Sequence, residues 1–177
     1  MAVLVAGRND AATPLATWVL LDRFAEVLVF ANDRLAQMSS GRYELVRVDD
    51  EAGSAGRRDR GLGLGVIDRF SPGGVRDPKT LSGGETFYVS LALALALADV
   101  VTAESGGVAM ETLFVDEGFG SLDPETLQAV LAELGRLQAG GRTVGIVSHV
   151  EELRRQIPDR IEVARAPSGS TLRITAS

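Results

Sequence analysis

The spacing of apolar positions near the start of the chain predicts one long helix. Its apolar residues alternate steps of three and four, as the buried stripe of a helix does: Leu21, Phe24, Leu28, Ala31, Leu35 and Met38. Thr13-Pro14 is a typical helix start, and Ser39-Ser40-Gly41 is a typical stop. Because the spacing is a seven-residue repeat, it fits either the last turns of a coiled coil or a helix docked on a body.

Short apolar segments after this helix predict antiparallel strands. Tyr43–Val48 and Gly61–Phe70 have strand composition, and the polar segment 49–60 between them is expected to be a mobile loop. Ser71-Pro72-Gly73-Gly74 has turn composition. We therefore expect a hairpin that returns through Val75–Thr80.

Residues 82–103 contain a run that can be interpreted in two ways. Leucine and alanine alternate with period two from Leu91 to Leu97, as in a strand, but both residues favour helices and neither is β-branched. Ser82 and Glu85 have the spacing of a capping box, which starts a helix. The prediction is a buried helix.

The second half of the chain alternates strands with helices. The expected elements are a strand at Glu111–Val115, a helix from Asp123-Pro124 to Gly140-Gly141, a strand at Thr143–Val147, a helix at Val150–Gln156 and a hairpin of Arg160–Arg165 with Thr171–Thr175. This order predicts an α/β layer with a parallel sheet.

Composition narrows the possible functions. The 177 residues fit one domain or one large piece of a larger one, and 45% are hydrophobic. The chain has no cysteine, one histidine and a net charge of −6, which argues against thiolate metal sites and a global attraction to nucleic acid. The longest strongly apolar run, Val89–Ala98, is half the length of a membrane span. We expect a soluble cytoplasmic protein with no membrane contact.

Leu81-Ser82-Gly83-Gly84-Glu85 is a candidate anion site at a helix start. The free backbone N–H groups and the helix dipole favour an anion there, and glycine allows a phosphate to approach closely. The alternative is a capping box without a ligand.

Two further segments place polar side chains at strand ends. Asp116 and Glu117 follow an apolar strand, where open α/β sheets bind ligands, although a solvated strand end would have the same sequence. His149 follows the strand Thr143–Val147, where a solitary histidine is usually only hydrogen-bonded. Asp123 before Pro124 is a good helix N-cap whether or not it has a further role.

Taken together and in this order, these segments resemble the C-terminal lobe of an ABC-type ATPase head. The forms LSGGETF, LFVDEGFGSLD and VSHV are most similar to the SbcC family of SMC-like ATPases, and the resemblance covers about residues 15–165. It implies that Leu81, Ser82, Gly83, Gly84 and Glu85 are the signature that contacts ATP of an opposing head. It also implies that Ser121, Leu122 and Asp123 are the D-loop.

The resemblance implies roles for the strand-end residues as well. Asp116 would hold Mg²⁺, through water, and Glu117 would be the general base. His149 would be the switch histidine near the γ-phosphate. ATP and Mg²⁺ are therefore the expected cofactors of an ATPase reaction.

The sequence contains no P-loop, which a complete head requires. Gly73–Thr80 is similar to a P-loop, but Pro78 stands in place of the second glycine and has no N–H to donate to a phosphate. Lys79 is therefore expected to be a solvated loop lysine. We therefore expect an α/β C-terminal half-head, inactive alone, whose N-lobe with Walker A is absent. The expected division is a coiled-coil base helix at 1–40, hairpin strands at 41–80 and the ATPase lobe at 81–177.

The family implies four partners: the Walker A lobe, a second head that pairs through ATP, an SbcD-type nuclease on helix 14–39, and DNA in the complex. An apolar face near segments 87–98 and 112–115 should be covered by the Walker A lobe. Arg57–Arg60 could contact phosphates, but a solvated loop is favoured.

Two alternative functions stay open: an SMC- or RecN-like ATP-switched clamp without a nuclease, and a non-catalytic binding domain.

Overall fold

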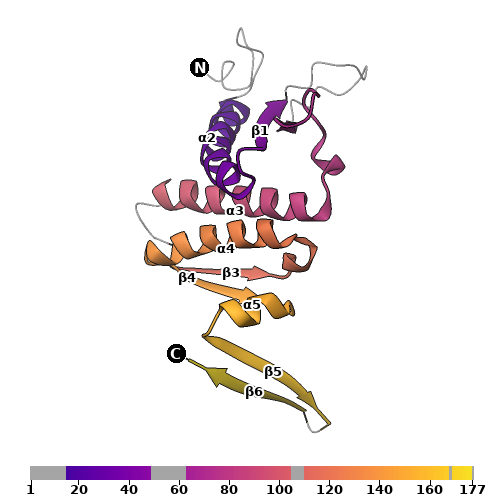
Figure 1. Cartoon of the computed structure of the whole chain (residues 1–177). Helices are drawn as coiled ribbons and strands as arrows, with labels where there is room; N and C mark the ends of the chain where they lie inside the picture. Colours follow the sequence, from indigo (N-terminus) through magenta and orange to yellow (C-terminus); the bar gives the residue numbers. More distant parts are fainter. Residues whose placement is uncertain (1–14, 49–62, 105–109, 168, 177) are drawn as a thin grey trace.

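The computed structural model describes residues 15–48, 63–104, 110–167 and 169–176. Its helices and strands are α2 (Leu15–Met38), β1 (Tyr43–Val48), β2 (Gly63–Asp68), α3 (Gly83–Glu104), β3 (Thr112–Asp116), α4 (Pro124–Ala139), β4 (Thr143–Val147), α5 (Glu151–Gln156), β5 (Arg160–Ala166) and β6 (Gly169–Thr175) (Figure 1). The expected helix start at Thr13-Pro14 and the expected loop at 49–60 lie outside the described residues.

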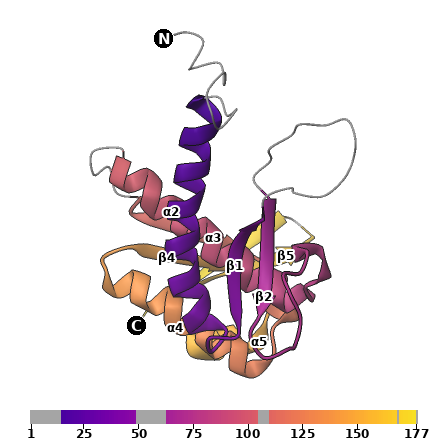
Figure 2. The same ribbon diagram turned by 90° about the horizontal axis from the view of Figure 1, so that it is seen from above.

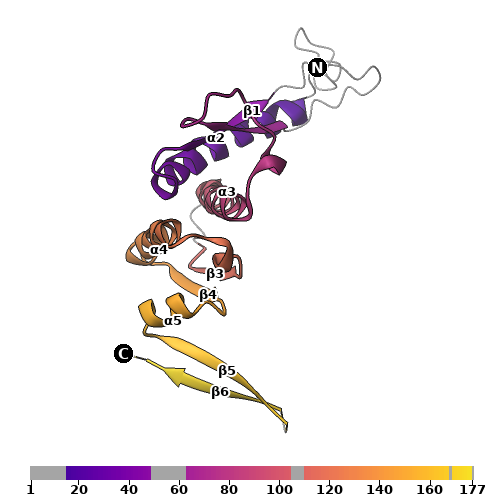
Figure 3. The same ribbon diagram turned by 45° about the vertical axis from the view of Figure 1, so that its right-hand side comes forward.

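Helix α3 lies between two layers. On one side are α2 and the antiparallel pair β1–β2, and on the other are α4 and the parallel pair β3–β4 (Figures 1 and 3). The antiparallel pair β5–β6 follows α5 and extends away from this stack. The parallel pair confirms the α/β organisation expected from the sequence.

The first layer forms because α2 docks along β1. The Asn32 side chain donates to the Leu45 carbonyl at 2.9 Å and accepts from the Leu45 N–H at 2.7 Å, so α2 satisfies both backbone groups of that strand residue. Viewed from above, α2 crosses α3 beside the strand pair (Figure 2). The helix stops as predicted, with Ser40 at φ 51° and Gly41 at φ 75°.

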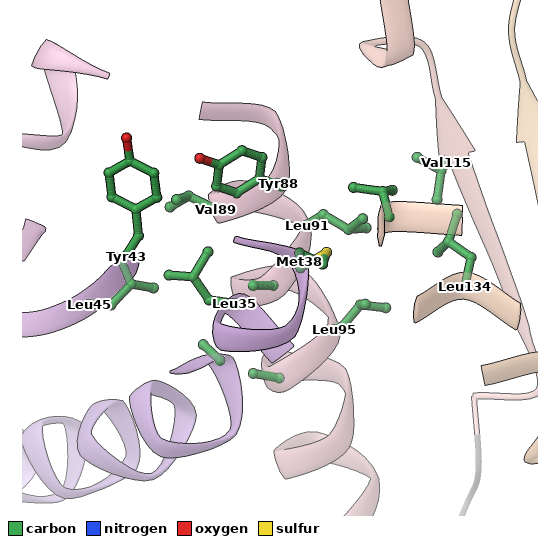
Figure 4. Close-up of a cluster of buried hydrophobic side chains, with 14 of the residues drawn as sticks. Leu35, Met38, Tyr43, Leu45, Tyr88, Val89, Leu91, Leu95, Val115 and Leu134 are labelled. Carbon is green, nitrogen blue, oxygen red and sulfur yellow. The ribbon is translucent and has the colours of Figure 1, made fainter. Parts of the chain in front are cut away.

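The core gathers around α3 (Figure 4). The period-two run is helical, as predicted, and seven residues of α3 are buried: Tyr88, Val89, Leu91, Ala92, Leu95, Ala96 and Val100. They pack between Leu35, Met38 and Leu45 of the first layer and Val115 and Leu134 of the second. This single core joins the two layers.

By length and composition alone, α3 is apolar enough to cross a membrane. The uninterrupted apolar run Val89–Ala98 is shorter than the helix, which also contains apolar residues on either side of that run. The core helix of a soluble protein meets the same criterion, and the buried face of α3 packs as a core helix does.

A network of ion pairs ties the three long helices together. Arg34 of α2 pairs with Asp99 of α3 and, at 2.5 Å, with Glu133 of α4. Arg142 also contacts Asp99, at 2.6 Å, and Arg136 contacts Glu133 through its Nε at 2.8 Å. Burial would raise the pKa of Asp99, but the hydrogen bonds from Arg142 and Arg34 lower it. The side chain of Glu133 is 3% exposed, and a charge so buried requires such partners.

The predicted return strand at Val75–Thr80 is wrong. The structure has a single bridge between Val66 and Arg76, followed by a 3₁₀ turn at Pro78–Thr80. Pro78 has no N–H to extend a ladder, and the Asp77 carboxylate accepts the Lys79 N–H at 2.9 Å, which starts the turn. Lys79 is exposed, as expected of a loop lysine.

The parallel pair leaves one face uncovered within the described chain. Leu113 and Val115 of β3 pack toward the core, whereas Phe114 points to the opposite face and is 71% exposed. Phe114 pairs in register with Gly145, whose missing side chain leaves room for the Phe114 ring. The sheet therefore presents an aromatic surface on the side away from α4.

Candidate functional site

The carboxyl ends of β3 and β4 place three candidate side chains at one edge. Asp116 is the exposed last residue of β3, and the next N–H, that of Glu117, donates to the Val147 carbonyl at 2.9 Å. This bond carries the strand pairing one residue further. Glu117 Oε1 and His149 Nδ1 lie 3.5 Å apart, although both side chains are largely exposed. The parallel pairing brings together residues that are far apart in the sequence.

Glu117 has an unusual backbone. Its backbone φ is 58°, in the left-handed region that residues other than glycine and asparagine seldom adopt. The chain therefore turns sharply directly after Asp116, where the strand ends. Strained residues of this kind cluster at functional sites, which makes Glu117 a stronger candidate than its sequence position alone indicates.

The turn after Glu117 is packed against the first turns of α3. Gly118 has φ 93°, and a Cβ at this position would overlap the ring of Phe87. The Phe87 ring lies 4.9 Å from that of Phe119, which is 1% exposed. The Ser121 hydroxyl donates to the Gly118 carbonyl at 2.8 Å and closes the turn. Only glycine satisfies both the backbone angle and the packing at position 118.

Gly118→Ala is expected to lower the free energy of unfolding by about 1–3 kcal/mol, because alanine strains the left-handed backbone and displaces Phe87. Gly120→Ala is the matched control: its Cβ would meet only Val150, at 3.8 Å, so a change within about 0.5 kcal/mol is expected. Denaturant unfolding of both variants measures the difference. Equal stabilities would contradict the packing role of Gly118.

The predicted capping box is present at the start of α3. The Ser82 N–H donates to Glu85 Oε2 at 2.7 Å, and the Glu85 N–H donates to the Ser82 hydroxyl oxygen at 3.3 Å. Leu81, directly before it, is half-buried and packs against the core. The first turn of α3 is therefore held by side chains, and Ser82 itself is exposed.

The segments expected to be the signature and the D-loop lie against each other. A Cβ on Gly84 would come 2.9 Å from the Ser121 carbonyl oxygen and 3.6 Å from Leu122 Cδ2. A Cβ on Gly83 would lie 3.6 Å from Ser121 Cβ. Glycine at position 84 permits this close approach of two backbones.

Asp123 acts as the N-cap of α4, as predicted. Its Oδ1 accepts the Thr126 N–H at 2.9 Å, and its Oδ2 accepts the Thr126 hydroxyl at 2.7 Å. The backbone bond from Thr126, followed by the hydroxyl bond, lowers the pKa of Asp123. Capping therefore engages both oxygens of this carboxylate.

The candidate residues form two connected groups. One is Glu117 with His149, and the other is the segment 81–85 with Ser121 and Leu122. Phe87 joins them, because it packs on Gly118 from the first turns of α3. The sequence motifs did not indicate Tyr43, whose hydroxyl donates to Glu85 Oε1. Nothing in the sequence around Tyr43 distinguishes it from an ordinary core residue, since aromatic side chains are common at the starts of buried strands.

Within the described residues, no group of three or more histidine or acidic side chains could hold a metal ion. Asp116 alone could supply one carboxylate to a Mg²⁺ ion that keeps most of its water and takes its other ligands from phosphates.

The α/β fold of this chain is similar to that of solved SMC ATPase heads. A structure described as "Structural biochemistry of ATP-driven dimerization and DNA stimulated activation of SMC ATPases" aligns with a TM-score of 0.66 and 15% identity, over 89% of this chain and 88% of that chain. The Smc head of Pyrococcus furiosus bound to the C-terminal domain of ScpA aligns with a TM-score of 0.61 and 14% identity, over 89% and 36%.

The sequence identifies the family. Residues 71–135 match the family described as SbcC/RAD50-like, Walker B motif. The chain is 50% identical over 168 residues to the SbcC subunit of nuclease SbcCD from Vibrio cholerae, covering 95% of this chain and 16% of that protein. It is 43% identical over 164 residues to the SbcC subunit from Treponema pallidum, covering 93% and 15%. The chain belongs to the SbcC family, and it spans about one sixth of the length of these relatives.

Proposed function

We propose that this chain is the lobe of an SbcC-like ATPase head that carries the signature and Walker B residues, and that it hydrolyses ATP only with a lobe that carries Walker A. The observation that carries the proposal is the 3.5 Å approach of Glu117 Oε1 to His149 Nδ1 at the carboxyl ends of β3 and β4. Ligands of open α/β sheets bind at these strand ends.

The strand-end residues act on the head's own nucleotide. ATP and Mg²⁺, when bound, supply the phosphoryl group and the charge that balances it. Asp116 would hold the metal through water. Glu117 accepts the proton of the attacking water at a carboxylate oxygen, and His149 orients the transferred group by a hydrogen bond.

The signature acts on the nucleotide of an opposing head. The Ser82 oxygen accepts the Glu85 N–H, and a hydroxyl that accepts one bond can still donate its own proton. Ser82 is exposed at the start of a 22-residue helix, where N–H groups and the dipole favour an anion. These features support contact between Ser82, Gly84 and a γ-phosphate held by the Walker A lobe of the second head.

An uncovered apolar face supports the need for the Walker A lobe. On the outer face of β3–β4, Phe114 is 71% exposed and Val147 is 52% exposed. The hairpin β5–β6 adds four exposed residues that share one face by their register: Ile161, Val163, Leu172 and Ile174. Segment 87–98, also expected to supply apolar surface, exposes Leu97 (53%), whereas Leu91 and Leu95 are buried within the chain itself.

Helix α2 is the proposed attachment point of an SbcD-type nuclease, within a complex that acts on DNA. Its N-terminal half exposes Trp18 and Leu20, which are 57% and 58% exposed, and Val29 is 62% exposed further along. Nuclease binding to α2 distinguishes this function from that of an SMC- or RecN-like clamp, which acts without an attached nuclease.

The purified chain alone is expected to show no ATP turnover, because the Walker A lobe supplies the phosphate cradle and its lysine. Adding a Walker A lobe of the SbcC family should produce turnover. Measuring phosphate release from the chain, from the lobe and from their mixture separates the contributions. Turnover by the chain alone would place the phosphate cradle within it, and an inactive mixture that still binds ATP would contradict the proposed function.

A further inference from the structure

Tyr43, the first residue of β1, lies outside the motifs of the proposed ATPase site. It is 3% exposed, and its hydroxyl donates to Glu85 Oε1. We propose that Tyr43 is a positioning residue for the signature loop: it fixes Glu85, and Glu85 fixes the backbone at Ser82. This inference rests on the proposed role of Leu81–Glu85.

Glu85 is held from two sides. Its Oε2 accepts the Ser82 N–H at 2.7 Å, as a capping box requires, while its Oε1 accepts the hydroxyl of Tyr43 from a different part of the fold. A capping box alone fixes a loop only relative to its own helix. Here the second oxygen ties the same loop to β1, so the first layer of the structure determines where the Ser82 hydroxyl lies.

Tyr43 is itself packed against neighbours on more than one side. Its ring lies 6.0 Å from that of Tyr88 on α3, and Figure 4 shows the two rings side by side. The guanidinium carbon of Arg42 lies 4.8 Å from the Tyr43 ring centroid. Arg42 in turn donates to both oxygens of the buried Asp68, at 3.1 Å and 2.8 Å. These contacts hold the Tyr43 ring beside α3, where its hydroxyl reaches Glu85.

The charges of both partners suit a strong hydrogen bond at neutral pH. Burial, and then the bond to Glu85, raises the pKa of Tyr43 to about 12, so the hydroxyl keeps its proton. Burial would raise the pKa of Glu85, but the hydrogen bonds from Tyr43 and Ser82 outweigh it and lower that pKa. The bond therefore joins a neutral donor to a carboxylate, a combination stronger than a bond between neutral groups.

The functional test uses a complete head formed by this chain and a Walker A lobe. Tyr43→Phe removes only the hydroxyl and is expected to weaken ATP-driven pairing of heads about tenfold. ATP binding to a single head should be unchanged, since Walker A lies on the other lobe. The control, Thr102→Val, removes a half-buried hydroxyl near the far end of α3, where it donates to the Ala98 carbonyl, and should leave pairing unchanged.

A second measurement uses the chain by itself. If Tyr43 holds the loop through Glu85, the Ser82 amide, which donates to Glu85, should exchange with solvent about tenfold faster in Tyr43→Phe. Nuclear magnetic resonance resolves this amide without any requirement for ATP or a second lobe. The same amide in Thr102→Val should exchange at the wild-type rate.

A double-mutant cycle separates positioning from general stability. Glu85→Ala should weaken pairing, and Tyr43→Phe should add nothing in that background, because its effect passes through Glu85. Additive losses, or wild-type pairing and exchange in Tyr43→Phe, would overturn the inference and leave the proposed function intact. If wild-type heads do not pair with ATP, the proposed role of the signature fails, and the exchange of the Ser82 amide still decides whether Tyr43 holds the loop.

Discussion

Replacing Glu117 with glutamine in a complete head is expected to lower ATP turnover roughly 10²–10⁴-fold and to prolong the ATP-bound pair of heads. The amide keeps the size of the carboxylate but cannot accept the proton of the attacking water. The structure supports this role because Glu117 directly follows Asp116, at the strand end where His149 also lies. ATP binding should be retained, since glutamine removes no contact that binding requires.

The matched control for this prediction is Glu111→Gln. Glu111 is an exposed carboxylate directly before β3, at the opposite end of the strand from Glu117. It tests whether the loss of any one negative charge near this strand affects turnover. Single-turnover measurements should show the chemical step slowed in Glu117→Gln and unchanged in Glu111→Gln. Near-normal turnover in Glu117→Gln would assign the general base to another residue.

Ser82→Arg is expected to abolish ATP-driven pairing of heads while each head still binds ATP. Ser82 is exposed beside Gly83 and Gly84, so an arginine there would fill the space that the proposed phosphate contact requires. The variant also loses the hydroxyl that accepts the Glu85 N–H, which should cost only about 1 kcal/mol of helix stability. Sedimentation with and without ATP measures pairing, and nucleotide titration measures binding.

Two controls separate the possible causes of that loss. Ser82→Ala removes the cap without adding bulk, so it should pair better than Ser82→Arg. Ser90→Arg adds the same side chain at another exposed position on α3 and should pair normally. If Ser82→Arg heads still form an ATP-dependent pair, the signature does not contact the nucleotide of the opposing head.

Elements encoded by neighbouring residues could be predicted from the sequence. The bounds of β1 and β4 agree with their predictions, because each is an apolar segment between turn residues. The caps at Ser82 and Asp123 also agree, because a capping side chain bonds to a backbone only three residues away. The order of the four motifs in the same sequence indicated the family to which the chain belongs.

Interactions between distant segments could not be predicted in this way. The expected strand at Val75–Thr80 was wrong because strand pairing depends on a partner edge, and Pro78 prevented the ladder from continuing. The sequence suggested that segment 87–98 supplies exposed apolar surface, and Leu97 does so, but leucine composition does not show which residues of a helix are buried. Packing against α2 and α4 buried Leu91 and Leu95.

By itself, the sequence determined most of the helices and strands, the caps and the kinds of chemical group available at each strand and helix end, since these depend on local backbone preferences and residue types. Only the tertiary structure decided which groups meet. Parallel pairing of β3 with β4 brought Glu117 within 3.5 Å of His149, and Phe87 excluded any side chain at Gly118. The docking of β1 beside α3 joined Tyr43 to Glu85 across 42 residues, a contact that no sequence motif encodes.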